Sequence, residues 1–133
     1  MNNSNRTALY EIPVPSTDFI ADAILCGNVI RYGYESEGHN VKSGLIFNKV
    51  KAKRTRAEGA CTKWHIEGAY DTLVEIEESE WINEILAETL ISREKSGEVW
   101  ELHHYLIYID GSGCIEVVAA SWKVLDEERG SWT

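Results

Sequence analysis

The chain has 133 residues, of which 44% are hydrophobic, and it carries a formal net charge of −9 at pH 7. This length predicts one domain, and this hydrophobic content is typical of a folded protein rather than a disordered one. The acidic balance disfavours a general nucleic-acid binder and binding to an anionic membrane surface, because both need clustered cations. We therefore expect no nucleic-acid partner and no membrane partner.

The amino terminus and the cysteines indicate the compartment. Residues 1–5 are polar and lack the apolar stretch that a secretion signal requires. The chain has three cysteines, an odd number, and none of them lies in a CxxC pair. Buried, inert thiols of this kind are typical of a reducing compartment. We expect a cytoplasmic protein.

The first third of the chain predicts two strands with a helix between them. Residues 7–12 predict a short strand that ends at two prolines, which cannot donate to a ladder. Residues 17–26 predict a helix that Gly27 terminates, and a strand across residues 23–34 is the alternative that the pattern leaves open. Residues 28–35 are rich in β-forming side chains and predict the second strand.

The longest alternating pattern lies in the middle of the chain. Residues 42–56 and 62–76 each alternate between apolar and polar side chains, and a short turn at residues 57–60 separates them. Because side chains on a strand point to opposite faces in turn, the two segments predict a long hairpin with one buried face and one wet face. The register of this hairpin places Leu45 opposite Leu73.

A basic run at residues 49–56 contains five of the 13 lysine and arginine residues. The predicted register places Lys51 across from Glu67 and Lys53 across from His65, and facing opposite charges are mildly stabilising. The run therefore predicts the outer face of the hairpin. An anion or nucleic-acid site is the alternative, although no glycine-rich phosphate loop lies beside it.

The second half of the chain predicts one helix and two strands. Ser79 is expected to cap the helix, and Gly97 helps to close it. Residues 98–110 and 113–125 predict the strands. The Asp-Gly-Ser-Gly sequence at residues 110–113 is typical of a hairpin turn between them.

Short turns between consecutive strands predict antiparallel pairing. We expect an α+β fold in a single domain, with a curved antiparallel sheet of five or six strands and one or two helices packed on one face. The long strands favour a half-barrel or cone-like shape. The domain is expected to span residues 7–125, between a flexible polar tail at residues 1–6 and an acidic polar tail at residues 126–133.

No catalytic motif of the GxSxG, HExxH, Walker or GxGxxG type is present. His103 and His104 are neighbours on a predicted strand, so their rings point to opposite faces. We expect His104 to be a hydrogen-bonded core histidine. A metal pair of His65 and His103 has no acidic or cysteine ligand at a suitable spacing. We therefore predict no catalytic residue, no metal site and no cofactor.

Three apolar residues occupy the wet parity of the hairpin, namely Leu45, Phe47 and Leu73. They predict a small exposed patch, and such patches mark interfaces. The preferred hypothesis is a non-enzymatic protein that acts through protein–protein contacts, either as a homodimer or with another protein.

The aromatic residues support two alternative functions. The first is a small-ligand-binding protein whose concave aromatic face is lined by Trp64, Tyr70, Trp100 and His104. The second is an enzyme of unknown class that uses the same pocket, with a histidine or glutamate as base. A titratable group with a strongly shifted pKa in that pocket would favour the enzyme.

Overall fold

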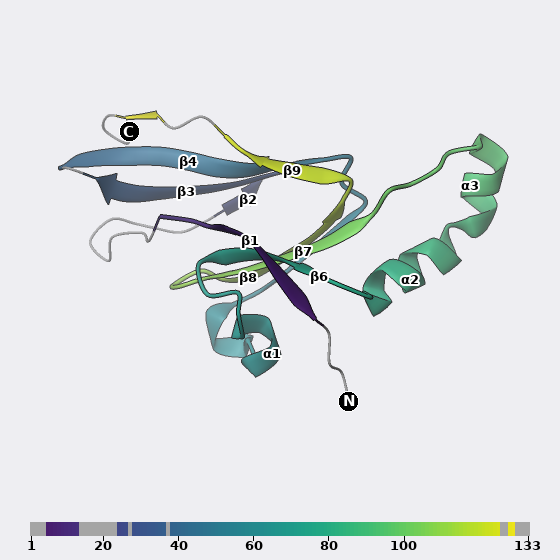
Figure 1. The fold of residues 1–133 in the computed structure, drawn as a ribbon, viewed down its shortest axis with the longest axis horizontal. Coiled ribbons are helices and arrows are strands. Elements are labelled where there is room, and N and C mark those ends of the chain that lie inside the picture. The colour runs from purple at the N-terminus through teal and green to yellow at the C-terminus, as the bar shows by residue number, and fades with distance from the viewer. Residues whose placement is uncertain (1–4, 14–23, 27, 37, 126–127, 130–133) are drawn as a thin grey trace.

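The computed structural model describes residues 5–13, 24–26, 28–36, 38–125 and 128–129, and it confirms the α+β class. The described strands form two five-stranded antiparallel sheets that share a hydrophobic core (Figure 1). The strands are therefore divided between two sheets, whereas the sequence predicted one sheet of five or six strands.

The first sheet has two fully buried strands at its centre. Its order is β1 (Arg6–Glu11), β6 (Thr72–Ile76), β7 (His103–Ile109), β8 (Gly113–Ala119) and β5 (Ala52–Arg56). All residues of β8 and all but the first residue of β7 are buried. Strands that are covered on both faces need apolar side chains at both parities, which explains the nearly continuous apolar runs of β7 and β8.

The second sheet is built on a long central hairpin. Its order is β10 (Glu128–Arg129), β4 (His39–Asn48), β3 (Val29–Ser36) and β2 (Ile24–Cys26), and β9 (Ser121–Val124) also pairs with β4. The chain passes from the first sheet to the second at Ala120, between β8 and β9. The strand predicted at residues 113–125 is thus divided between the two sheets. The pair Glu128–Arg129, which the sequence placed in a tail, forms β10.

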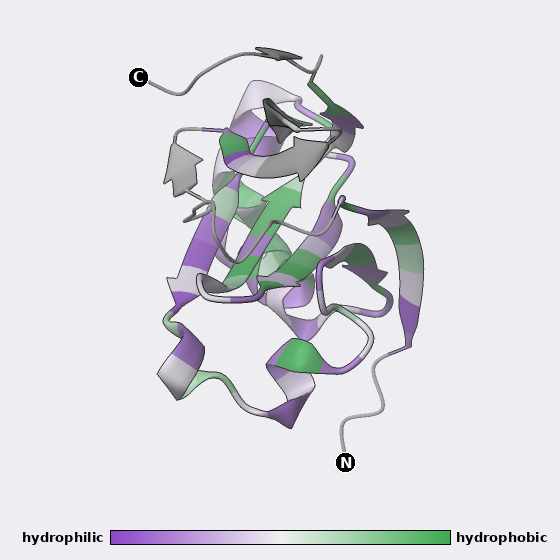
Figure 2. Ribbon diagram, turned by 90° about the vertical axis from the view of Figure 1, so that its left-hand side faces the viewer, coloured by the Kyte–Doolittle hydropathy of each residue, from purple (hydrophilic) through white to green (hydrophobic). Residues whose placement is uncertain are grey.

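The core has two parts, one on each face of the first sheet. Tyr105, Ile107 and Ile109 of β7 pack with side chains of the second sheet. Leu106 and Tyr108 of the same strand pack on the other face, where the short helix α1 (Lys63–Ile66) contributes partly buried residues. Figure 2 shows the apolar residues gathered on the central strands. This division follows the two-residue period of side chains on a strand.

The predicted hairpin of residues 42–56 and 62–76 is wrong. The strand β4 pairs with β3, β5 pairs with β8, and β6 pairs with β1 and β7. In this arrangement Lys53 lies opposite Val117 rather than His65. The strand β4 pairs with the strand before it, whereas β5 and β6 pair with strands farther away along the chain, so the charge pairing that we expected across this hairpin does not form.

The second arm of that hairpin is a helical turn followed by a strand. After the 3-10 helix η1 (Glu58–Ala60), the helix α1 begins beyond Thr62, whose backbone N–H donates to Nδ1 of His65 at 2.9 Å. Gly68 and Asp71 then take positive φ angles of 73° and 51°, which turn the chain into β6. The alternating side chains before Gly68 therefore lie on a helix rather than on a strand.

The predicted patch of Leu45, Phe47 and Leu73 is not exposed. All three side chains are completely buried in the core between the sheets. Leu45 lies between Ile30 of β3 and Val124 of β9, so it does not face Leu73 across a hairpin. The homodimer, which rested on this patch, stays a prediction.

The helix predicted at residues 17–26 is wrong at its end. Residues 17–23 lie outside the described residues. Ile24–Cys26 form β2, which pairs with residues 29–31 of β3 in a tight hairpin. The strand alternative is therefore confirmed for these three residues.

Several local predictions are confirmed. The strands β1 and β3 lie within one residue of the predicted ranges. Ser79 caps α2 (Glu80–Glu88), because its Oγ accepts a hydrogen bond of 3.2 Å from the Ile82 N–H. The helix α3 (Leu90–Ser96) follows and ends at Gly97 with a φ of 73°. Both helices extend away from the sheets on one side (Figure 1). In the part of the chain that the structure describes, no helix is long and apolar enough to cross a membrane.

Candidate functional site

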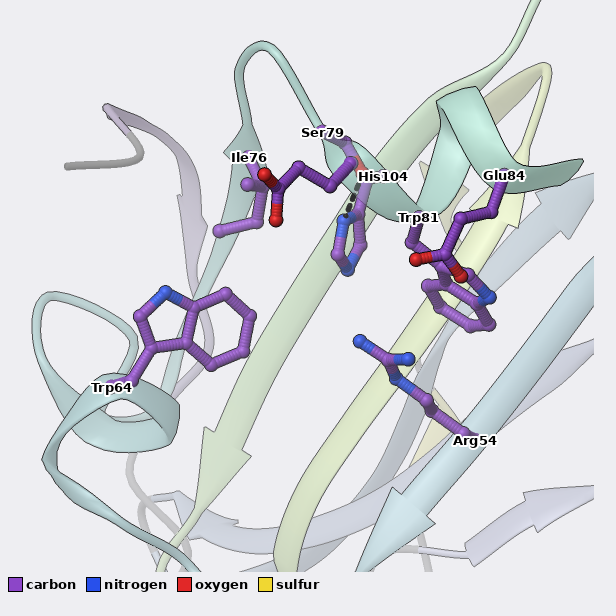
Figure 3. A pocket seen from close by; sticks show the side chains of 8 residues that line it. Arg54, Trp64, Ile76, Ser79, Trp81, Glu84 and His104 are labelled. Atoms are coloured by element: carbon purple, nitrogen blue, oxygen red, sulfur yellow. Dashed lines mark hydrogen bonds between the residues drawn. The ribbon is translucent and has the colours of Figure 1, made fainter. Parts of the chain in front are cut away.

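A hollow of about 260 Å³ lies between the start of α2, the helix α1 and the first sheet (Figure 3). Its lining residues are Arg54, Trp64, Ile76, Ser79, Glu80, Trp81, Glu84 and His104. The sheet register brings these elements together, because Ile76 at the end of β6 lies opposite His104 of β7. Three residues after Ile76 the chain reaches Ser79, which places the amino terminus of α2 over the histidine.

Four polar side chains form a continuous hydrogen-bonded chain at this site. Arg54 donates from Nε and Nη2 to the two carboxylate oxygens of Glu116, at 2.9 and 3.0 Å. His104 Nε2 lies 2.7 Å from Glu116 Oε1, and His104 Nδ1 lies 2.7 Å from Ser79 Oγ. Glu116, His104 and Ser79 are all buried. The prediction that His104 is a hydrogen-bonded core histidine is confirmed.

Glu116 stays ionised in this buried position. Burial alone would raise its pKa, but hydrogen bonds from His104 and Arg54 and the positive charge of Arg54 outweigh burial and lower the pKa to about 2. A carboxylate in that state accepts hydrogen bonds and donates none. The chain of polar groups is therefore anchored on a fixed negative charge.

Two tryptophans form the apolar walls of the hollow (Figure 3). The Arg54 guanidinium lies 3.9 Å from the ring centroid of Trp81, and the His104 ring meets Trp81 edge-on at 5.2 Å. On the opposite wall, Arg6 lies 4.8 Å from the ring centroid of Trp64 and donates to the carbonyl oxygen of Trp64. Each indole of the hollow is therefore packed against an arginine side chain.

One polar atom of the walls is unsatisfied. The Nε1 atom of Trp64 is buried and has no hydrogen-bond partner among the residues that the structure describes. A buried donor without an acceptor is unfavourable by about 1–3 kcal/mol. Such groups are rare in folded proteins, and a role in ligand binding is one explanation for them.

Two carboxylates of α2 also line the hollow. Glu80 and Glu84 are exposed, and neither forms a hydrogen bond or an ion pair with another described residue. Since Arg54 is neutralised by Glu116, these two carboxylates give the hollow a negative charge. The hollow therefore combines the apolar walls of the two tryptophans with two unpaired carboxylates that can accept hydrogen bonds.

The structure brings together two of the four residues predicted to bind a ligand. Trp64 and His104 line the hollow, whereas Tyr70 and Trp100 do not. Tyr70 is half exposed and packs against Tyr108 at 5.4 Å between ring centroids. Trp100 lies between Lys51, at 4.3 Å, and Arg93, at 5.6 Å.

Arg54, Ser79 and Trp81 are site residues that the sequence did not predict as such. Ser79 was expected only as the cap of a helix, and Arg54 only as part of the basic run. Arg54 and Glu116 are 62 residues apart, and the pairing of β5 with β8 leaves no local signal. The only sequence feature that could have indicated the site is the helix cap Ser79 with Trp81 two residues later, since both residues line the hollow.

A second hollow of about 250 Å³ lies at the edge of the second sheet. Its lining residues are Asn28, Ile46, Phe47, Asn48, Ser121, Trp122 and Lys123. Lys123 is the one charged side chain in this lining, and Asn28 is engaged with the Phe47 carbonyl oxygen at 3.0 Å. The hollow contains no cluster of titratable groups, so the first hollow is the better candidate.

The described residues contain no group of three or more histidine, cysteine, aspartate or glutamate residues that could hold a metal ion. His65 and His103 do not come together, because His65 lies in α1 and His103 lies between Glu75 and Glu101. No protein-family model matches the chain, and no curated protein and no solved structure is significantly similar to it.

Proposed function

We propose that this is a binding protein whose hollow beside α2 takes an organic cation, an ammonium or guanidinium group on an apolar stem. The observation that carries the proposal is the pair of unpaired carboxylates, Glu80 and Glu84, beside apolar walls. Both carboxylates are exposed, but the apolar walls beside them lower the local dielectric below that of open water, which strengthens their attraction for a cation. Trp64 and Ile76 would contact the stem while the head group reaches Glu80 and Glu84.

The size of the hollow limits what it can hold. Small-molecule sites usually measure about 300–1,000 Å³. A volume of about 260 Å³ suits one small amine or one long side chain rather than a nucleotide-sized cofactor. The same chemistry could come from a free amine or from a lysine or arginine side chain of a partner protein. The net charge of −9 would accelerate the approach of either cation.

Calorimetric titration with three probes tests the proposal. The probes are n-butylguanidinium, n-butylammonium and a blocked tripeptide with a central arginine, and butyrate is the anionic control. We expect the cations to bind and butyrate not to bind. A tripeptide that binds clearly more tightly than n-butylguanidinium would indicate a partner protein, and equal or weaker binding would indicate a free amine.

Matched variants locate the binding site. We expect Glu80→Gln and Glu84→Gln each to weaken cation binding about 2–5-fold, because each removes one partly exposed charge pair. Glu88→Gln is the control, since Glu88 is an exposed carboxylate of the same helix that does not line the hollow. Equal binding of butyrate, or equal loss in all three variants, would reject the proposal.

A further inference from the structure

With a neutral imidazole at His104, the hydrogen bonds at the hollow assign a position to each proton. Ionised Glu116 can only accept, so His104 Nε2 carries a hydrogen and donates it at 2.7 Å. In a neutral imidazole the other nitrogen, Nδ1, is then an acceptor. Ser79 Oγ accepts from the Ile82 N–H and directs its own hydrogen to Nδ1 at 2.7 Å. The serine hydroxyl therefore faces a base that a buried carboxylate orients.

We propose that Ser79 is a nucleophile, that His104 is its general base, and that the hollow hydrolyses small acyl esters. A nucleophile within hydrogen-bond reach of a base, with that base oriented by a third group, is the arrangement that activates a hydroxyl. Glu116 is a positioning residue here, because it acts through His104. The inference goes beyond cation binding, since an uncharged ester needs neither Glu80 nor Glu84.

The two imidazole nitrogens have exchanged roles relative to the usual Ser–His–Asp arrangement. There Nε2 faces the serine and Nδ1–H faces the carboxylate, whereas here Nδ1 faces Ser79 and Nε2–H faces Glu116. Either nitrogen can accept the proton, because only one of them carries a hydrogen in the neutral ring. Such sites are recognised by their geometry and roles rather than by sequence position.

The start of α2 provides donors for the developing oxyanion. The first N–H groups of a helix have no acceptor within the helix, and the helix dipole favours negative charge there. In α2 these are the N–H groups of Glu80 and Trp81, directly after the nucleophile. A carbonyl attacked by Ser79 would place its oxygen at this helix end, where backbone N–H groups stabilise tetrahedral intermediates.

The reaction balances with water as the only co-reactant. Ser79 Oγ forms a bond to the ester carbonyl carbon while its proton passes to His104 Nδ1. The bond from that carbon to the alkoxy oxygen then breaks, and the leaving alcohol takes the proton from His104. A water molecule then forms a bond to the acyl carbon and gives a proton to His104. The bond from that carbon to Ser79 Oγ breaks, Oγ takes the proton from His104, and the carboxylic acid is released. The walls of Trp64, Trp81 and Ile76 suit a short apolar acyl group.

Labelling with an ethyl fluorophosphonate probe tests the nucleophile directly. We expect intact-mass spectrometry to show one adduct per chain and peptide mapping to place it on Ser79. Ser79→Ala should abolish the adduct, and Ser92→Ala, at an exposed serine on α3, should leave it unchanged. No adduct on the folded protein, or an adduct at another residue, would overturn the proposal.

Two further variants keep the test informative, because Ser79→Ala also removes a helix cap. With p-nitrophenyl acetate we expect a burst of nitrophenol in the wild type and about a 100-fold slower burst in His104→Gln. In Glu116→Gln the burst rate at saturating ester should fall while the ester concentration for half-maximal rate stays in place, because Glu116 orients His104 and does not contact the ester. A merely structural Glu116 would change the amount of folded protein but would leave the burst rate per labelled site unchanged. Absence of labelling in the wild-type protein, together with intact cation binding, would reject the hydrolase and retain the binding protein.

Discussion

Arg54 and Glu116 lie directly opposite each other on the neighbouring strands β5 and β8, and two hydrogen bonds join them. The pair is asymmetric, since 49% of the arginine side chain is exposed but only 5% of the glutamate side chain. The half-exposed arginine keeps part of its hydration while the buried carboxylate gains two charge-assisted hydrogen bonds. This pair fixes the carboxylate that binds His104, and it joins the strand β5 to its neighbour β8.

The lowered pKa of Glu116 predicts a loss of stability in acid. A folded-state pKa of about 2 in place of 4.5 gives stability that is present above pH 4.5 and is lost as the pH falls towards 2. At about 1.4 kcal/mol per pH unit, the loss is roughly 3 kcal/mol. Urea unfolding of the wild type and Glu116→Gln between pH 2 and pH 6 measures it. The difference between the two proteins should shrink at low pH, and a constant difference would contradict the account.

His103 and His65 should titrate in a defined order. Burial lowers the pKa of His103, but hydrogen bonds to Glu101 and Glu75 outweigh it and raise the pKa above 6.5. Burial and the nearby Arg56 charge lower the pKa of His65 below 6.5. The contacts of protonated His103 with Glu75 and Glu101 therefore stabilise the fold fully below pH 6.5. This stabilisation is lost as the pH rises through the raised pKa that His103 has in the folded protein.

Imidazole NMR signals recorded from pH 4 to pH 9 check this order. We expect the His103 midpoint above the His65 midpoint. In Glu101→Gln the His103 midpoint should fall while the His65 midpoint stays in place. Equal midpoints in the wild type would show that the carboxylates do not hold the His103 proton.

The burial of Phe47 predicts a large stability loss on truncation. Its side chain is completely buried and packs against Tyr105 at 5.5 Å between ring centroids, so Phe47→Ala should destabilise the fold by about 3–5 kcal/mol. The control Ile91→Ala, at a residue that is 72% exposed on α3, should cost less than about 0.5 kcal/mol. Urea unfolding measures both. Similar losses would contradict the position of Phe47 in the core.

Gly113 should tolerate no side chain. Its φ is 107°, and a Cβ atom there would lie 2.2 Å from the carbonyl oxygen of Arg56 on the neighbouring strand β5. Gly113→Ala should therefore destabilise the protein by more than about 2 kcal/mol. Gly59→Ala is the matched control, since nothing lies within 4 Å of a Cβ atom there. Thermal unfolding of both variants checks the contrast, and a small loss at Gly113 would contradict this close approach.

Short-range features of the fold could be predicted from the sequence. The cap at Ser79, the closure at Gly97 and the turn at residues 110–113 depend on neighbours within a few positions. Each of them therefore leaves a local signal. The α+β class followed from the number and order of these elements.

The strand partners could not be predicted in the same way. Alternation in residues 62–68 looked like a strand, but α1 and the positive φ of Gly68 interrupt it. The pairing of residues 42–56 with residues 62–76 was inferred because the two segments are close along the chain. The strand β5 instead pairs with β8, which lies some 60 residues later. The site depends on that distant pairing, because it is what joins Arg54 to Glu116.

The most direct test of the account is an NMR titration of the ¹⁵N-labelled protein with n-butylguanidinium. If the hollow beside α2 binds organic cations, the indole N–H signals of Trp64 and Trp81 and the amide signals of residues 79–84 will shift together in a saturable manner. The indole signal of Trp100, which lies outside the hollow, will stay in place. Shifts spread evenly over the acidic surface, or no saturable shift at Trp64 and Trp81, would contradict the proposed binding site.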